Sequence, residues 1–178
     1  IGGIAINRSI LPKVPYDALK DVQPIALTST GSQMLAVSNV VPIKSVRDLI
    51  NHAKANPGKL LNASSGNGSP GHLSGELFKQ MAGVNIAHVP YKGGAQAMTD
   101  MMSGQVHLIF ESMSSISPHH RGGRLRGIAV TGPKRLSSFP DLPTIAESGV
   151  PGYEVTVWGG MIAPMGVSKT VIARLNDT

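Results

Sequence analysis

The sequence predicts an α/β protein whose sheet is mostly parallel. Along the middle of the chain, short apolar runs alternate with segments of helical period, and loops rich in glycine and serine separate them. Strands of about five residues alternating with helices of about ten are typical of parallel sheets with right-handed crossovers. The composition agrees, since 41% of the 178 residues are hydrophobic and 15% are charged, as in ordinary globular proteins.

The first helix of this region is predicted in the segment SVRDLINHAKANPGK. Ser45 is its expected N-cap, Asp48 follows three residues later, and apolar residues such as Val46 and Leu49 share one face. The Pro-Gly pair at 57–58 ends the helical pattern.

A strand, a glycine loop and a second helix follow directly. The strand is predicted at residues 60–64 (LLNAS), and the loop is SGNGS. Ser69 is placed to cap the next helix, and Pro70 occupies its first position, where a missing N–H costs nothing. Gly83 ends that helix.

The same alternation continues to residue 131. Strands are predicted at 85–89 (NIAHV), 106–110 (VHLIF) and 125–131 (LRGIAVT), a helix in AQAMTDMMSG, and a short helix or turn in SSISPHHRGG. In a parallel sheet every strand-to-helix loop lies at the carboxyl edge. The loops SGNGS, PYKGGA and ESMSS are therefore predicted to line one rim.

The outer parts of the chain are richer in proline and glycine. They include VPYDALKDVQPIAL near the start and PDLPTIAESGVPGYEVTVWGG near the end, where Thr144 and Glu147 form the capping box of a short predicted helix. We expect 1–30 and 152–178 to form a partial first lobe and 31–151 a second lobe, with crossing strands near 26–38 and 155–163. The first ten residues read like the end of a strand entering a loop, and the last twelve stop inside a helical pattern, as in a chain trimmed at both ends.

Charge and composition exclude several classes of function. Sixteen basic and ten acidic residues leave a net charge of +6, which suits small anions, nucleic acid or an acidic membrane surface. Basic residues are scattered and aromatic residues make up only 4%, so nucleic-acid binding is not expected. The absence of cysteine excludes disulfides and cysteine-based metal sites. No apolar run approaches the roughly 20 residues needed to cross a bilayer, so membrane insertion is not expected.

The glycine loop before Pro70 has two interpretations. A helix start preceded by glycines exposes backbone donors and the positive end of the helix dipole, which favours an anion. In the other interpretation, Ser69 only caps its own helix and the glycines only turn the chain. The loop alone does not decide between them.

Two more specific motifs are incomplete at this loop. Gly66, Gly68 and Gly71 form the dinucleotide fingerprint G-x-G-x-x-G, but the acidic residue expected about 20 positions further on is missing. A nucleophile elbow around Ser69 would need glycine at the place of Asn67. We therefore predict no cofactor.

The titratable residues do not assemble a reaction. The histidines singled out are His72, His88, His107, His119 and His120. No two of them have the spacing of a helical metal pair, so no metal site is predicted. Glu111 alone lies on the predicted rim, and one carboxylate does not make an acid–base pair. We assign no catalytic residues and do not expect an enzyme, although a small-molecule enzyme using this rim remains the alternative.

Three long segments together resemble a known family. ASSGNGSPGHLSGELF, HVPYKGGAQAMTDMMSGQV and AVTGPKRLSSFPDLPTIAESGVPGYEVTVWGGMIAP are similar to the extracytoplasmic solute receptors of the tripartite tricarboxylate transporter class, often called the Bug family. The resemblance covers nearly the whole chain. It implies the type II periplasmic-binding-protein fold, in which two lobes joined by crossing strands close on a ligand, here truncated at both ends.

The resemblance also implies a function and a site. The function is that of a periplasmic receptor that captures a small organic carboxylate in an interlobe cleft and delivers it to the membrane permease subunits of the transporter. The implied ligand-binding residues are Gly2, Gly3, Asn7, Ser64, Ser65, Asn67, Gly68, Ser69, His72, Tyr91, Lys92, Gly93, Gly94, Ala95 and Glu111. His107 and Glu111 stand where the family often has aspartate. The family's first strand, its last helices and its signal peptide would lie outside this sequence.

Overall fold

The computed structural model describes residues 5–10 and 12–177. The chain divides into two units, of which unit 1 comprises Ile1–Thr30 and Val157–Thr178, and unit 2 comprises Gly31–Thr156. Residues 152–156 group with unit 2, where Tyr153 is 1% exposed and packs into the core.

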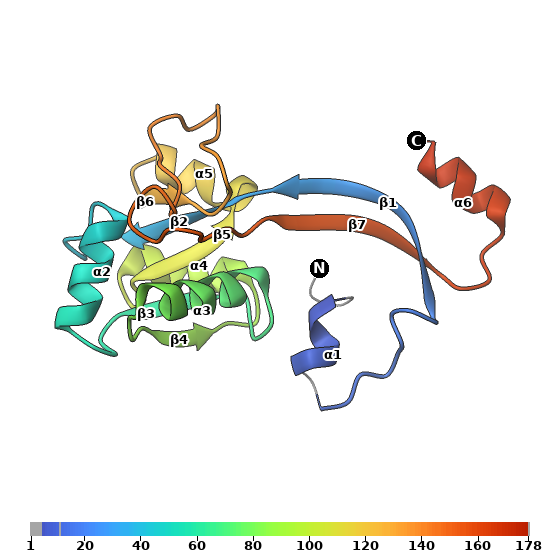
Figure 1. The fold of residues 1–178 in the computed structure, drawn as a ribbon, viewed down its shortest axis with the longest axis horizontal. Coiled ribbons are helices and arrows are strands. Elements are labelled where there is room, and N and C mark those ends of the chain that lie inside the picture. The colour runs from blue at the N-terminus through green and yellow to red at the C-terminus, as the bar shows by residue number, and fades with distance from the viewer. Residues whose placement is uncertain (1–4, 11, 178) are drawn as a thin grey trace. The chain divides into compact units, whose positions relative to one another are not determined.

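Unit 2 is built on one mixed sheet with the strand order β4-β3-β5-β2-β6 (Figure 1). The strands are β2 (Gln33–Ser38), β3 (Leu61–Ser64), β4 (Ala87–Pro90), β5 (Leu108–Ser112) and β6 (Leu125–Val130). β3 pairs in parallel with β4 and β5, whereas β2 is antiparallel to both of its neighbours, β5 and β6. The α/β prediction is therefore confirmed, but the sheet is mixed: two of its strand pairings are parallel and two are antiparallel, because β2 runs opposite to the other strands.

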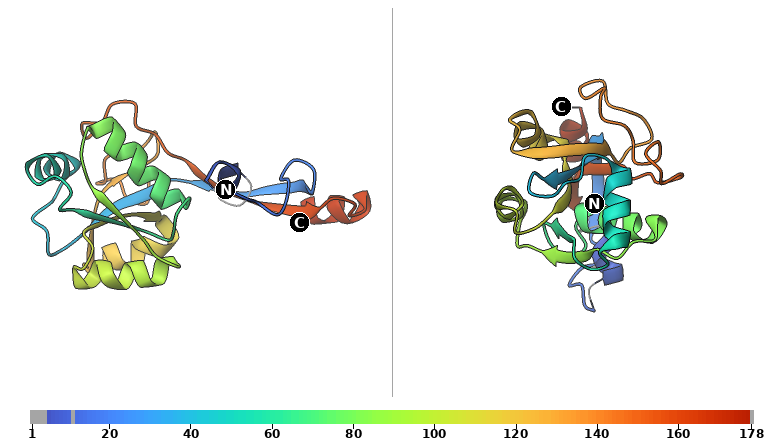
Figure 2. Two further views of the ribbon diagram at one scale, coloured as in Figure 1. Left: turned by 90° about the horizontal axis from the view of Figure 1, so that it is seen from below. Right: turned by 90° about the vertical axis from the view of Figure 1, so that its left-hand side faces the viewer.

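Helices cover both faces of this sheet (Figure 2). They are α2 (Val46–Ala55), α3 (Pro70–Ala82), α4 (Gly94–Ser103) and α5 (Met113–Arg121). One core cluster contains buried residues of α2 and α3, and the other contains those of α4 and α5. Residues of β2 alternate between the two clusters, and all six are buried.

The predicted helix ends are confirmed. Ser45 caps α2 by accepting a hydrogen bond from Asp48 N–H at 3.1 Å, and Ser69 caps α3 by accepting one from His72 N–H at 3.3 Å. Gly83 ends α3 with a φ of 62°, a left-handed conformation that favours glycine.

Helix α3 lies close to the sheet because two of its residues lack a side chain. A Cβ at Gly71 would overlap the carbonyl oxygen of Phe110 in β5, and one at Gly75 would overlap the side chain of Asn62 in β3. This close packing places the start of α3 against the carboxyl ends of β3 and β5.

Three local predictions were wrong. Thr144 and Glu147 form the reciprocal hydrogen bonds of a capping box, at 3.0 and 3.1 Å, but a turn follows them, because Gly149 adopts a φ of 113° that breaks helical geometry. The expected loop ESMSS is not a loop, because pairing with β2 continues to Ser112 and α5 begins at the next residue. Near the start, residues 7–10 form a helix where a strand entering a loop was expected.

Unit 1 contains α1 (Asn7–Ile10), β1 (Val22–Gly31), β7 (Val157–Pro164) and α6 (Lys169–Asn176). β1 and β7 form a two-stranded sheet. β7 overlaps the segment 155–163 expected for one crossing strand, whereas β1 overlaps only the first part of 26–38, since 33–38 form β2 of unit 2. Met165 N–H donates to Asp21 O at 2.8 Å and ties the end of β7 to the start of β1. In the part of the chain that the structure describes, no helix combines the length and apolar character needed to cross a membrane.

Candidate functional site

The predicted rim exists at the carboxyl edge of the sheet in unit 2. β3, β4 and β5 run in the same direction, so the segments that follow them emerge at one edge. Tyr91 N–H donates to Ser64 O at 2.9 Å and joins the first two of these segments. Gly66 has a φ of 130°, and a Cβ there would lie 3.2 Å from Tyr91 O, so both conformation and space call for glycine.

The Ser64–Ser69 segment, which we call the glycine loop, is held by its own hydrogen bonds. Ser64 is buried, and its Oγ accepts from Gly66 N–H at 3.2 Å. Ser69 N–H donates to Gly66 O at 3.1 Å, and Gly68 N–H donates to His72 Nδ1 at 3.1 Å. The backbone N–H groups of Gly66, Gly68 and Ser69 are therefore engaged within this region.

Two residues at the tip of the glycine loop differ from the others. Ser65 and Asn67 are exposed. Among the described residues, no hydrogen-bond acceptor lies opposite their backbone N–H groups. These two donors, next to the positive end of α3, are the groups of the loop that an anion can reach without displacing an existing bond.

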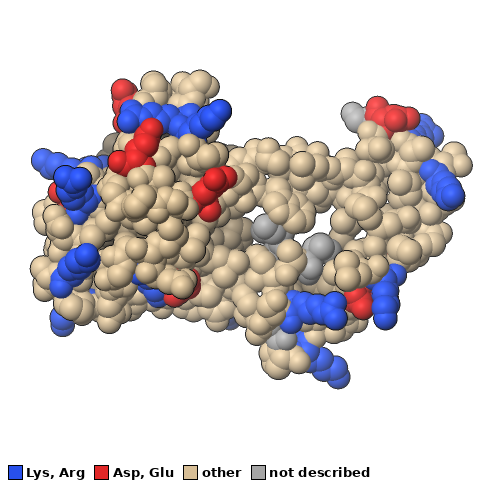
Figure 3. All heavy atoms as spheres, viewed as in Figure 1, with Lys and Arg blue, Asp and Glu red and all other residues tan. Residues whose placement is uncertain are grey.

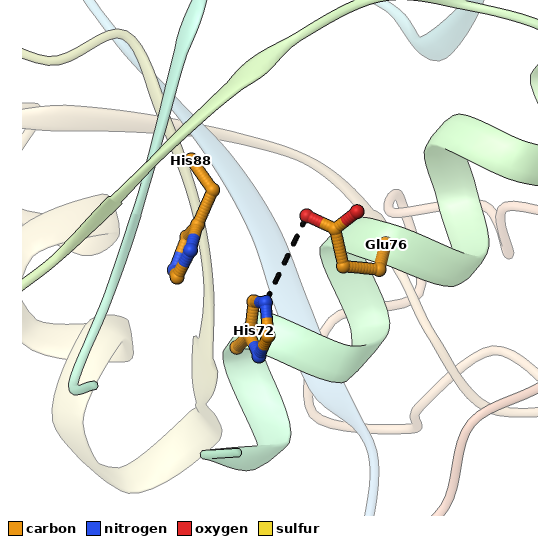
Figure 4. Close-up of side chains that lie close together, drawn as sticks. All are labelled: His72, Glu76 and His88. Atoms are coloured by element: carbon orange, nitrogen blue, oxygen red, sulfur yellow. Dashed lines mark ion pairs between the residues drawn. The ribbon is translucent and has the colours of Figure 1, made fainter. Parts of the chain in front are cut away.

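Two histidines that lie close together in Figure 4 contact the glycine loop, His72 through Gly68 and His88 through Ser64. His72 of α3 and His88 of β4 stack with ring centroids 4.1 Å apart and an interplanar angle of 23°. His88 Nε2 lies 2.7 Å from Ser64 Oγ. Burial lowers the pKa of His88, and the neighbouring His72 lowers it further. His88 was expected to be an ordinary surface or interior histidine, because no local pattern in the sequence links it to His72.

Glu76 stands one turn along α3 from His72. Its Oε1 lies 3.9 Å from His72 Nε2 and 2.6 Å from Lys79 Nζ. The spacing of four residues between His72 and Glu76 is the signal that could have indicated this pair from the sequence.

His72, Glu76 and His88 offer potential metal-ligand atoms within 4.8 Å of one another. Ligand atoms of a tetrahedral zinc centre lie roughly 3.4 Å apart, and each imidazole points its lone pair at the ion in the plane of its ring. Stacked rings direct their lone pairs side by side, and His72 Nδ1 and His88 Nε2 already have partners. The observed rotamers therefore do not form a metal centre.

The second rim segment leads from β4 into α4. Tyr91 donates its hydroxyl to Asp100 Oδ2 at 2.7 Å, and burial together with this carboxylate raises the pKa of Tyr91 to about 12. Lys92 is exposed. Gly93 precedes α4 and provides no side-chain cap, so the first-turn N–H groups of α4 have no side chain from the N-cap as partner.

A cavity of about 390 Å³ opens beside the start of α4. Its lining residues are Gly94, Ala95, Met98, Glu111, Ser115 and His119. Glu111 accepts a hydrogen bond from Ser112 N–H at 2.7 Å, and its other oxygen would lie 3.3 Å from a Cβ at Gly94. The carboxylate of Glu111 thus already lies near the positive end of α4, which makes the glycine loop the more favourable place for a further anion.

The other predicted site residues lie elsewhere. Asn7 belongs to α1 in unit 1, where its Nδ2 donates to the Tyr16 hydroxyl at 3.3 Å. Gly2 and Gly3 lie outside the described residues. His107 accepts a hydrogen bond from Leu61 N–H at 3.0 Å, at the amino end of β3 and so opposite the rim. The ligand-binding role of the whole predicted set stays a prediction.

The charged side chains do not gather at one place on the face shown in Figure 3. Lys and Arg are spread over it and interspersed with Asp and Glu. This distribution differs from the continuous basic surface typical of nucleic-acid-binding proteins.

Comparison with known proteins places the chain in a family. Residues 4–178 match the family model described as "Tripartite tricarboxylate transporter family receptor". BugT of Bordetella pertussis is 34% identical over 97% of this chain and 53% of its own length. The chain spans about half the length of the curated relatives it matches.

Two of the solved structures that are similar to this chain are described with a bound ligand. "R. palustris Rpa4515 with adipate" matches with a TM-score of 0.96 and 40% identity, over 99% of this chain and 59% of that one. MatC from Rhodopseudomonas palustris "with bound malate" matches with a TM-score of 0.88 and 27% identity, over 96% of this chain and 58% of that one. The architecture is thus that of periplasmic binding proteins, and the chain belongs to the tripartite tricarboxylate transporter receptor family.

Proposed function

We propose that this protein is part of a periplasmic solute-binding receptor that captures a small organic carboxylate and delivers it to the permease subunits of a tripartite tricarboxylate-type transporter. Membership of the receptor family supports the transport role. The adipate and malate named for two structurally similar proteins support a carboxylate as the ligand.

The observation that carries the proposal is the glycine loop at the start of α3. It combines the positive end of a helix with the exposed N–H groups of Ser65 and Asn67. A helix terminus contributes about 0.3–1 kcal/mol to the binding of an exposed anion, and up to about 2 kcal/mol when the site is partly buried. Several such donors must act together, and backbone donors recognise a carboxylate without specifying the rest of the molecule.

A thermal-shift screen tests the proposal. The panel contains adipate, malate, monocarboxylates, aromatic acids and nucleotides. A ligand at 100 times its Kd stabilises the folded protein by about 2.7 kcal/mol, which raises Tm by several degrees. We expect a shift with one class of carboxylate and none with nucleotides. A shift with nucleotides alone, or chemical conversion of the ligand, would contradict the receptor function.

A matched pair of variants locates the site. Ser69→Ala and Ser45→Ala each remove the N-cap hydroxyl of a helix in unit 2, so both should cost about 1 kcal/mol of stability. Only Ser69 lies in the glycine loop, so only Ser69→Ala should also weaken carboxylate binding, as measured by titration calorimetry. Equal binding by the two variants would show that the glycine loop is only structural.

A further inference from the structure

The bond between Gly68 and His72 fixes where a proton can reside. Gly68 N–H donates to His72 Nδ1, so Nδ1 must be unprotonated in this structure. The neutral ring then carries its proton on Nε2, which faces Glu76 Oε1 at 3.9 Å. A second proton can be added only at Nδ1. The new N–H would then point directly at the N–H of Gly68, and two donors that face each other repel.

His88 leaves His72 as the member of the pair that takes this proton. The two rings stack at 4.1 Å, so charging both would place two positive charges in contact. Burial lowers the pKa of His88, which keeps that ring neutral. Its Nε2 also remains bonded to Ser64, so the other end of the glycine loop is held in either state.

We propose that a carboxylate binds to the glycine loop together with one proton, taken from solvent by Nδ1 of His72. The inference rests on the proposed function and concerns the regulation of the same site. Protonation removes the acceptor of Gly68 N–H. Gly68 is buried, unlike Ser65 and Asn67, so its N–H then lacks a partner unless the bound anion accepts from it. It also places a positive charge at the start of α3, where it attracts the bound anion.

Charged and titratable groups face the histidine pair from α3 and β4. In the region described, Glu76 and Lys79 of α3 are the charged residues that face the histidine pair, His88 is the titratable group contributed by β4, and β3 contributes the uncharged Ser64. The carboxylate of Glu76 pairs with the imidazolium, although Lys79 neutralises part of its charge at 2.6 Å. A ligand carboxylate supplies the second negative charge that the free protein lacks.

Proton uptake is measured by titration calorimetry with adipate and malate in buffers of different ionisation enthalpy. We expect net uptake of up to about one proton per ligand, and a Kd that tightens up to about tenfold for each unit that the pH falls between about pH 8 and about pH 6.5. Both acids stay largely ionised in this range. Proton release, or a Kd that does not change with pH, would overturn the proposal.

Three variants assign the proton. His72→Asn keeps an oxygen close to the place of Nδ1 but cannot be protonated, so it should bind without proton uptake. Glu76→Gln removes the partner of the imidazolium and should reduce uptake, which provides a second test if His72→Asn does not fold. His107→Asn removes a histidine at the opposite end of β3 and should leave uptake unchanged.

The outcomes separate this proposal from the function on which it rests. Uptake that persists in His72→Asn would assign the proton to another group and refute the role of His72. Binding without any pH dependence would refute the proton linkage and leave the receptor function intact. If no carboxylate binds at either pH, the receptor function fails, and the linkage fails with it.

Discussion

Substitution of Ser74 should destabilise unit 2 more than its small size suggests. Ser74 lies on α3 with no exposed surface, and its Oγ hydrogen bonds to Oε1 of Gln33 at the start of β2. Gln33 is 3% exposed, and its Nε2 donates to Phe110 O at 3.3 Å. The pair therefore connects α3 to two strands of the sheet through groups that water does not reach.

Ser74→Ala leaves Gln33 Oε1 buried without its partner. An unsatisfied buried acceptor costs about 1–3 kcal/mol, more than the net value of the bond itself. For a protein of this size, a loss of about 2 kcal/mol lowers Tm by roughly 4–8 °C. Urea unfolding followed by circular dichroism, together with a thermal scan, measures both quantities.

The control is Ser103→Ala. Ser103 donates its hydroxyl to a backbone carbonyl of its own helix, Asp100 O at 3.1 Å, and unlike Ser74 it is exposed. Its loss should change stability by no more than about 0.5 kcal/mol. If the two variants lose the same free energy of unfolding, the buried acceptor of Gln33 does not determine the cost of losing Ser74.

Three other changes have expected outcomes. Gly71→Ala should cost about 1–3 kcal/mol in urea unfolding, because its Cβ meets Phe110 O, whereas Gly31→Ala meets nothing within 4 Å and should be nearly neutral; equal costs would contradict the close packing of α3. Burial lowers the pKa of His107, so the folded state favours the neutral ring, and the free energy of unfolding should fall as the pH drops below about 6.5. His107→Asn should reduce this pH-dependent loss of stability, as measured by unfolding at about pH 7.5 and about pH 5.5. Glu111→Gln removes a negative charge from the rim and should tighten carboxylate binding about three- to fivefold by calorimetry, and weaker binding would show that Glu111 contacts the ligand favourably.

Local chemistry made the helix ends and the rim predictable. A cap such as Ser69 or Gly83 acts on backbone groups within three or four residues of itself, so the sequence contains nearly all the information needed. The rim follows from the alternation of strands and helices, because that pattern directs the carboxyl ends of β3, β4 and β5 to one edge.

Contacts between distant residues account for what the sequence did not show. The direction of β2 depends on pairing with β5 and β6, which no local pattern records. The same pairing carries β5 through Glu111 to Ser112 and removes the expected loop. The stacking of His72 on His88 depends on how closely α3 packs on β3 and β4, so the support of the glycine loop became visible only in three dimensions.

The reversed strand β2 has a consequence for how unit 2 folds. β2 comes first among the strands of this unit, yet Met34 pairs with Glu111 on one side and with Val130 on the other. A growing chain can therefore form the β3–β4 pair early, whereas β2 has no partner until most of the unit has been synthesised. Contacts between such distant positions slow folding, and an apolar strand without partners is prone to self-association. We expect β2 to be the segment of unit 2 that most needs protection by a chaperone before the sheet closes.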